Sequence, residues 1–162
     1  MKEILAYIIN SRCTPVSWHS ISKETSIASP NTVESYVENM KDLFILLILN
    51  LIEPDSKIAY RKNKKVHITD PFLYNSIAEY VRARPFESSI LESVVAAHLA
   101  RKYETFYWRN KTEVDIVIRL DKIQVGVEVK TWAGSWRKPK HIKSIILLNK
   151  ETIPTFLASL DI

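Results

Sequence analysis

The sequence has very few of the residues that build several common kinds of functional site. It contains one cysteine, Cys13, and two glycines, Gly126 and Gly134, in 162 residues. A single cysteine cannot form a disulfide within the chain, so we expect a reducing, cytoplasmic setting. Two isolated glycines cannot form a glycine-rich phosphate-binding loop, which excludes a nucleotide-hydrolysing site of that kind.

Long hydrophobic runs are also missing. The longest, FILLILNLI at residues 44–52, includes Asn50 and is less than half of the roughly 20 residues that a bilayer-spanning helix needs. The first residues have no apolar core followed by a small-residue cleavage site, so we expect neither a membrane span nor a secretion signal. With 46% hydrophobic and 25% charged residues, the chain has the composition of a folded globular protein. Its net charge of +5 permits a polyanionic partner without identifying one.

The pattern of elements changes near Pro85. Residues 1–84 resemble three helices followed by a strand pair, and residues 85–162 resemble a helix, a hairpin, a strand and a helix. We therefore predict an α/β (α+β) fold with a winged helix-turn-helix domain at residues 1–84 and an α/β domain at residues 85–162.

The three N-terminal helices are predicted from their apolar spacing and start signals. The third has Ser29 as its N-cap and Pro30 at its first helical position, and the second ends near Ser26. The residues predicted to face the core are Ile4, Leu5, Ile8, Ile9, Trp18, Ile21, Ile27, Val33, Tyr36, Val37, Met40 and Leu43.

A wing is predicted at residues 53–65, between strands at residues 43–52 and 65–70. It carries four cations in five residues, and these are either contacts to a nucleic-acid backbone or part of a solvated loop. The exposed face of the third helix carries Glu34 and Glu38, which disfavours its insertion into a DNA groove. We therefore expect the winged helix to dock protein rather than to read bases. The four cations are Arg61, Lys62, Lys64 and Lys65.

Residues 112–130, TEVDIVIRLDKIQVGVEVK, alternate as two strands of a hairpin. If Asp121 and Lys122 form a two-residue turn, Asp115 faces Glu128 and Glu113 faces Lys130. The other face is apolar and is expected to be buried. It consists of Val114, Ile116, Ile118, Leu120, Ile123, Val125, Val127 and Val129.

Two carboxylates directly opposite each other on a sheet repel, so something should compensate their charge. A divalent cation would do this, since Mg²⁺ prefers oxygen ligands. The alternative is an amphipathic hairpin whose charges face water. Glu92 favours the metal, because it lies in line with Val95 and Leu99 on the apolar side of a helix at residues 86–103. It could also lie at the border of that side and reach water.

A helix glutamate, then EVD, then VEVK is an order that resembles the PD-(D/E)XK nuclease superfamily, which includes restriction endonucleases and Holliday-junction resolvases. The proline-aspartate position reads Val114-Asp115 here. More closely, the chain resembles the C-terminal region of archaeal and bacterial AAA-type ATPases, a winged helix followed by a nuclease-like domain of unknown function. The matching stretches are SPNTVESYVENM, KKVHITDPFLYNSI, LESVVAAHL, FYWRNKTEVDIVI and VGVEVK.

The resemblance implies a restriction-endonuclease-like mixed sheet flanked by helices and a site for Mg²⁺ or Mn²⁺. Asp115, Glu128 and the carbonyl of Val129 would hold one ion, and Glu92 would bind a second ion or its water. Lys130 would position that water and offset charge on the phosphate. The implied partners are DNA and an ATPase module, and a homodimer is possible. A salt bridge between Glu113 and Lys130 would either orient the lysine or hold it away.

Aromatic and basic residues flank the hairpin. Trp108 and Arg109 precede it, and residues 132–143 follow it. They would either stack bases and grip a nucleic-acid backbone at the rim of the site, or form part of the core. The predicted cations after the hairpin are Arg137, Lys138, Lys140 and Lys143, beside Trp132 and Trp136.

Two functions are therefore predicted as alternatives. One is a metal-dependent nuclease that hydrolyses phosphodiester bonds in DNA. The other is a docking or regulatory module of an ATPase that binds DNA or protein without catalysis. The histidines, His19, His67, His98 and His141, have no spacing typical of zinc ligands and are assigned no metal.

Overall fold

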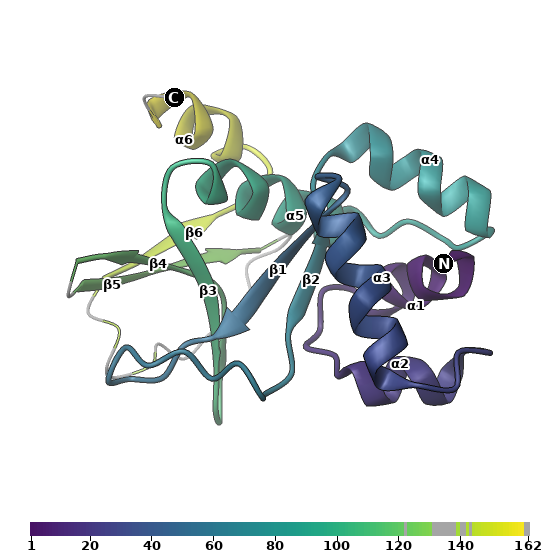
Figure 1. Ribbon diagram of the computed structural model, residues 1–162. Coiled ribbons are helices and arrows are strands. Elements are labelled where there is room, and N and C mark those ends of the chain that lie inside the picture. Colours follow the sequence, from purple (N-terminus) through teal and green to yellow (C-terminus); the bar gives the residue numbers. More distant parts are fainter. Residues whose placement is uncertain (122, 131–138, 140–141, 143, 161–162) are drawn as a thin grey trace.

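A computed structural model describes residues 1–121, 123–130, 139, 142 and 144–160 (Figure 1). Helices and strands combine around one mixed sheet, which confirms the predicted mixed α and β fold class. The helices are α1 (Lys2–Ser11), α2 (Trp18–Glu24), α3 (Pro30–Asp42), α4 (Pro71–Val81), α5 (Glu87–Ala100) and α6 (Ile153–Ser159). The strands are β1 (Leu46–Leu51), β2 (Lys65–Ile68), β3 (Glu104–Arg109), β4 (Glu113–Leu120), β5 (Ile123–Val129) and β6 (Ser144–Leu148).

The strands form one six-stranded sheet in the order β2-β1-β3-β4-β5-β6. β1 runs parallel to β3, with Asn50 beside Phe106 and Leu51 beside Tyr107, and β5 runs parallel to β6; the other neighbours are antiparallel. Through β1 the sheet continues from the strand pair of the N-terminal part into the strands that carry the predicted site. Both parts therefore contribute residues to the same sheet.

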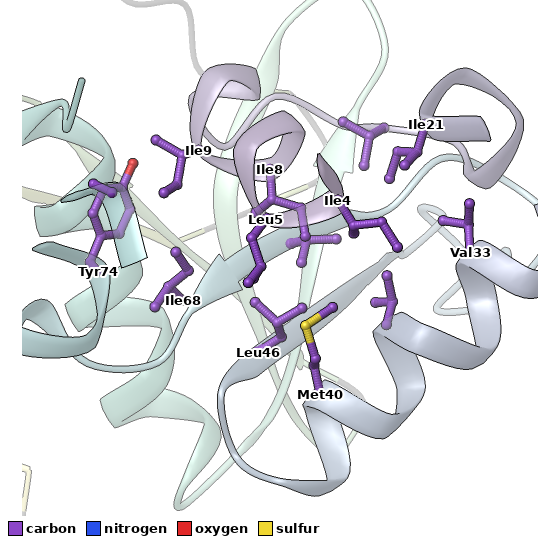
Figure 2. Packing of buried hydrophobic residues seen from close by; sticks show 14 residues of the cluster. Ile4, Leu5, Ile8, Ile9, Ile21, Val33, Met40, Leu46, Ile68 and Tyr74 are labelled. Carbon is purple, nitrogen blue, oxygen red and sulfur yellow. The ribbon is translucent and has the colours of Figure 1, made fainter. Parts of the chain in front are cut away.

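Helices α1 to α4 gather at the β2 end of the molecule (Figure 1). Their apolar side chains form a core with one face of β1 and β2, and Figure 2 shows Ile4, Leu5 and Ile8 of α1 pointing into it. Most residues predicted to face this core do so, but the prediction for Leu43 is wrong. α3 ends at Asp42, and Leu43, just past the helix, is 67% exposed. Tyr36 lies at the border of the buried stripe and is also exposed.

β2 presents two different faces. Val66 and Ile68 belong to the N-terminal core, whereas Lys65 and His67 point the opposite way because side chains alternate along a strand. Lys65 is 1% exposed and His67 is fully buried. The prediction that Lys65 is part of an exposed wing is therefore wrong, because the strand begins at this residue and takes its side chain inside.

The hairpin of β4 and β5 has the predicted register, with Ile116 opposite Val127 and Leu120 opposite Ile123. The prediction of one uniformly buried apolar face is wrong in two places. A register shift between β3 and β4 places Val114 in a core cluster with Val117, not with Ile116. At the turn, Leu120 and Ile123 are 40% and 61% exposed because the hairpin tip extends beyond the helices that cover its base.

α5 lies across the sheet and contacts strands from both halves of the chain, β2 among them. Val95, Ala96 and Leu99 pack into the core on this face of the sheet. The predicted last helix is confirmed as α6, and Phe156 and Leu157 pack against the same core. Within the part of the chain that the structure describes, no helix is both long and apolar enough to cross a membrane.

Candidate functional site

Asp115 and Glu128 lie together on the neighbouring strands β4 and β5. The backbone N–H of Asp115 donates to Oε2 of Glu128 at 3.2 Å, and the N–H of Val129 donates to Oδ2 of Asp115 at 3.1 Å. Glu128 is 3% exposed, so these carboxylates are not simply facing water. The structure thus brings together the carboxylates whose adjacency the register predicts.

The buried ammonium group of Lys65 joins this cluster from β2. Its Nζ lies 2.8 Å from Oε1 of Glu92, 2.7 Å from Oε1 of Glu113 and 3.0 Å from Oδ1 of Asp115. Burial acts to lower the pKa of Lys65, but the three carboxylates outweigh it and hold this pKa well above its ordinary value. One buried cation from the N-terminal part therefore offsets part of the negative charge of the acidic groups from α5 and β4.

Two of the acidic groups have raised pKa values. Burial raises the pKa of Glu92 to about 8, with Lys65 opposing the shift. Burial and the charge of Asp115 raise the pKa of Glu128, and the ammonium of Lys130 opposes that shift. Desolvation and like-charge neighbours of this kind are common at functional sites, although structural ion pairs produce them too.

Lys130 forms its ion pair with Oε1 of Glu128, two residues before it in β5. Glu113, which the register placed opposite Lys130, instead contacts Lys65, and its other oxygen lies 3.5 Å from Nε of Arg109. Among the described residues, the ion pairs thus join Lys130 to Glu128, and Glu113 to Lys65 and Arg109. Lys130 is left 39% exposed beside the cluster.

A second group of polar side chains lies next to Lys65. Nδ1 of His67 is 3.2 Å from Oγ of Ser93 on α5, and Nε2 of His67 is 3.9 Å from Oε1 of Glu92. Burial and the charge of Lys65 lower the pKa of His67 to about 3, so its imidazole is neutral. The thiol of Cys13 lies 3.7 Å from Oγ of Ser93, and burial and the charge of Glu92 raise its pKa.

The residues predicted to contact nucleic acid differ in how exposed they are. Arg61 and Lys62 are exposed in the wing, and Arg109 is 53% exposed at the end of β3. Lys64 is half-buried, and its Nζ donates to the carbonyl oxygen of Tyr60 at 2.6 Å. Trp108 is 7% exposed and belongs to the core, not to an open stacking surface. The other predicted residues, Trp132, Trp136, Arg137, Lys138, Lys140 and Lys143, lie outside the described residues.

Sequence reasoning missed Lys65, His67, Cys13 and Ser93 as members of this site. The signal for two of them was present in the stretch KVHI, where polar and apolar residues alternate. A strand flanked by core on one side must bury Lys65 and His67 if its other side is also covered. No comparable signal marked Cys13 or Ser93, because their position depends on how α1 and α5 approach β2.

The cluster has the chemistry of a divalent-cation site. Glu92, Glu113, Asp115 and Glu128 are four carboxylates near three cations, Lys65, Arg109 and Lys130. With all four carboxyl groups ionised, as metal binding would require, one negative charge is left over. Oxygen donors converge from three elements, which suits Mg²⁺ and Mn²⁺. The contacts of Lys65 to Glu92 and Asp115 mean that an ion between these two carboxylates would compete with the ammonium.

A family model described as "Domain of unknown function (DUF4143)" matches residues 87–157. The match covers less than half of the chain, but it includes α5, β3 to β6 and most of α6, and so contains Glu92, Asp115, Glu128 and Lys130. Lys65 and His67, which complete the buried cluster, precede the matched segment. No curated protein and no solved structure matches the chain.

Proposed function

We propose that this protein is a metal-dependent nuclease of the PD-(D/E)XK type that hydrolyses phosphodiester bonds in DNA. The observation that carries the proposal is the convergence of Asp115, Glu128 and Lys130 on neighbouring strands with Glu92 of α5. These are the residue types, in the order, that the resemblance to this superfamily requires. The shared buried contact of Glu92 and Asp115 with Lys65 supports their belonging to one site.

Each residue has a role that follows from its position. Asp115 and Glu128, with the carbonyl oxygen of Val129, would bind Mg²⁺ or Mn²⁺, and Glu92 would bind a second ion or its water. A divalent ion there supplies Lewis-acid polarisation of the phosphate. Lys130 is partly exposed and paired with Glu128, and its ammonium would offset the charge that develops on the phosphate oxygens.

The exposed cations give the substrate a surface to lie on. Arg61 and Lys62 of the wing and Arg109 at the end of β3 are exposed cations that can contact a phosphate backbone. Phosphate contacts of this kind position a nucleic acid without reading its sequence. Further predicted phosphate contacts follow the motif lysine in the chain and lie outside the described residues: Arg137, Lys138, Lys140 and Lys143.

The test is Mn²⁺-dependent cleavage of duplex, single-stranded and four-way-junction DNA. The full chain is compared with Asp115→Asn and Lys130→Met, and Asp121→Asn in the exposed hairpin turn serves as the matched control. We expect each site variant to lose about 100-fold or more in rate, since removing one preorganised electrostatic contact costs about that much. Cleavage that survives both substitutions would contradict the assignment.

The second candidate function is a non-catalytic docking or regulatory module of an AAA-type ATPase. The buried ammonium group of Lys65 favours it. Lys65 already contacts Glu92 and Asp115, two of the carboxylates assigned to metal binding, so the cluster is stabilised without metal. Phe44 is 83% exposed and lines a pocket of about 570 Å³ with Leu46 and Leu47, which suits contact with a protein partner. Absence of both cleavage and Mn²⁺ uptake in a folded chain would favour this function. Heat released on Mn²⁺ binding, and lost in Asp115→Asn, would argue against it.

A further inference from the structure

We propose that Cys13, His67 and Glu92 form a Zn²⁺ site at the junction between the N-terminal helices and the sheet. The proposed nuclease function uses neither Cys13 nor His67, and the two sites share only the carboxylate of Glu92. The three ligands come from the turn after α1, from β2 and from α5, which explains why their spacing along the sequence does not resemble a zinc motif.

The geometry brings three different donor atoms together. Sγ of Cys13, a ring nitrogen of His67 and a carboxylate oxygen of Glu92 all lie within 4.8 Å of one another. In a tetrahedral zinc site, bonds of about 2.0–2.3 Å place neighbouring ligand atoms about 3–4 Å apart. Nε2 of His67 and Oε1 of Glu92 are already 3.9 Å apart, so side-chain shifts of about 1 Å would complete the arrangement.

An unpartnered nitrogen points to a missing ligand. His67 is fully buried, and within the described residues its Nε2 has no hydrogen-bond partner. A buried polar atom left without a partner is costly, and an unplaced ion is one of the standard reasons for such an atom. In the tautomer whose Nδ1–H donates to Oγ of Ser93, the Nε2 lone pair is free to bind a metal. Ser93 would then orient the ligand, as outer-shell groups commonly do in metal sites.

The donor set selects the ion. A thiolate and an imidazole are the ligands that zinc prefers, whereas Mg²⁺ prefers oxygen alone. The charges also balance. When Zn²⁺ binds, the protons of Cys13 and Glu92 pass to solvent, as metal ligands require. Glu92, Glu113 and Asp115 then exceed Lys65 and Arg109 by one negative charge, and the Cys13 thiolate makes the excess two. One Zn²⁺ ion would neutralise this group.

Cobalt spectroscopy provides the first test. Co²⁺ replaces Zn²⁺ in sites of this type, and bonding to a thiolate gives it a sulfur-to-metal charge-transfer absorption in the near ultraviolet. Cys13 is the single cysteine of the chain, so any such absorption must come from it. The full chain is refolded with one equivalent of Co²⁺, because the ligands are buried. We expect the band to appear and to disappear on addition of one equivalent of Zn²⁺. A chain that folds with Co²⁺ present and shows no band overturns the proposal.

Variants then assign the ligands. His67→Gln should remove the band, whereas the exposed His19→Gln should keep it. Ser93→Ala should weaken Co²⁺ binding about 10- to 100-fold, the usual effect of losing a group that orients a ligand. A band of unchanged intensity in His67→Gln, with folding verified by circular dichroism, would also overturn the proposal.

The same set of proteins separates this inference from the proposed nuclease function. Asp115→Asn should abolish DNA cleavage but keep the Co²⁺ band, because Asp115 is not a zinc ligand. A wild-type chain with the band and without cleavage would reject the nuclease and retain the zinc site. Cleavage without the band would reject the zinc site alone.

Discussion

The two faces of β2 are both buried, but by opposite kinds of chemistry. Val66 and Ile68 pack among the apolar side chains of the N-terminal helices, as Figure 2 shows for Ile68. Lys65 and His67 instead pack against α5 and the hairpin. The consecutive residues Lys65 and Val66 thus point to opposite faces of the strand. Val66 enters an apolar core, and Lys65 places a buried ammonium group among three carboxylates.

The contrast shows two ways in which burial can stabilise a fold. On the apolar face the stabilising free energy is roughly proportional to the apolar area removed from water. This hydrophobic contribution does not depend on the orientation of the buried groups. On the polar face burial costs free energy unless each charge keeps its partners. The apolar face should therefore tolerate small changes in size, while the polar face should be sensitive to the loss of a single group.

The largest expected effect is that of Lys65→Met. This change leaves the carboxylates of Glu92, Glu113 and Asp115 buried without their shared cation, which typically costs about 3–5 kcal/mol. Urea unfolding with a chelator present measures it. Lys62→Met, in the exposed wing, is the control and should change the free energy of unfolding by less than about 0.5 kcal/mol.

The pH dependence of this variant sharpens the comparison. Without Lys65 the buried carboxyl groups bind protons more readily in the folded than in the unfolded chain. Raised folded-state pKa values stabilise the fold at low pH, and this stabilisation is lost as the pH rises through them. The deficit of Lys65→Met relative to wild type should therefore shrink as the pH is lowered. A deficit that is constant with pH would show that lost packing, not charge, is its cause.

Ile68→Ala tests the apolar face and should cost about 2–5 kcal/mol, because it removes buried methyl groups and leaves a cavity. Ile68→Val is the matched variant, with an expected cost of about 0.5–1.5 kcal/mol. Unlike the Lys65 deficit, both costs should be the same at pH 5 and pH 8 in urea unfolding. A pH-dependent cost for Ile68→Ala would remove the distinction between the two faces.

The smallest expected effect concerns the start of α4, directly after β2. Oδ1 of Asp70 accepts hydrogen bonds from the N–H groups of Phe72 and Leu73. Asp70→Ala should lower the free energy of unfolding by about 1 kcal/mol, the usual effect of losing an N-cap. Asp70→Ser should restore most of it, and thermal unfolding followed by circular dichroism would measure both. No recovery with serine would indicate that the aspartate acts by something other than capping.

Much of the local structure could be predicted from residue spacing. The helix starts, the strand pair and the hairpin register follow from periods of 3.6 and 2 residues and from turn chemistry. Leu43 and Tyr36 show the limit of this reasoning. Spacing alone extended the buried stripe to Leu43, past the end of α3, and it did not show that Tyr36 lies at the border of the stripe. Val114 shows another limit. A register shift between β3 and β4 moves its side chain to the other face of the sheet, and the hairpin sequence does not indicate how β3 pairs with it.

The sequence by itself determined that Asp115 would lie beside Glu128, because two strands joined by a tight turn have few possible registers. It also determined that Val66 and Ile68 would share a face of β2, because alternation is a property of the extended backbone. Only the tertiary structure decided that Lys65 would meet Glu92, and that His67 would meet Cys13. Those contacts join elements far apart in the chain, and they form only because α5 covers the face of the sheet to which β2 adds its polar side chains.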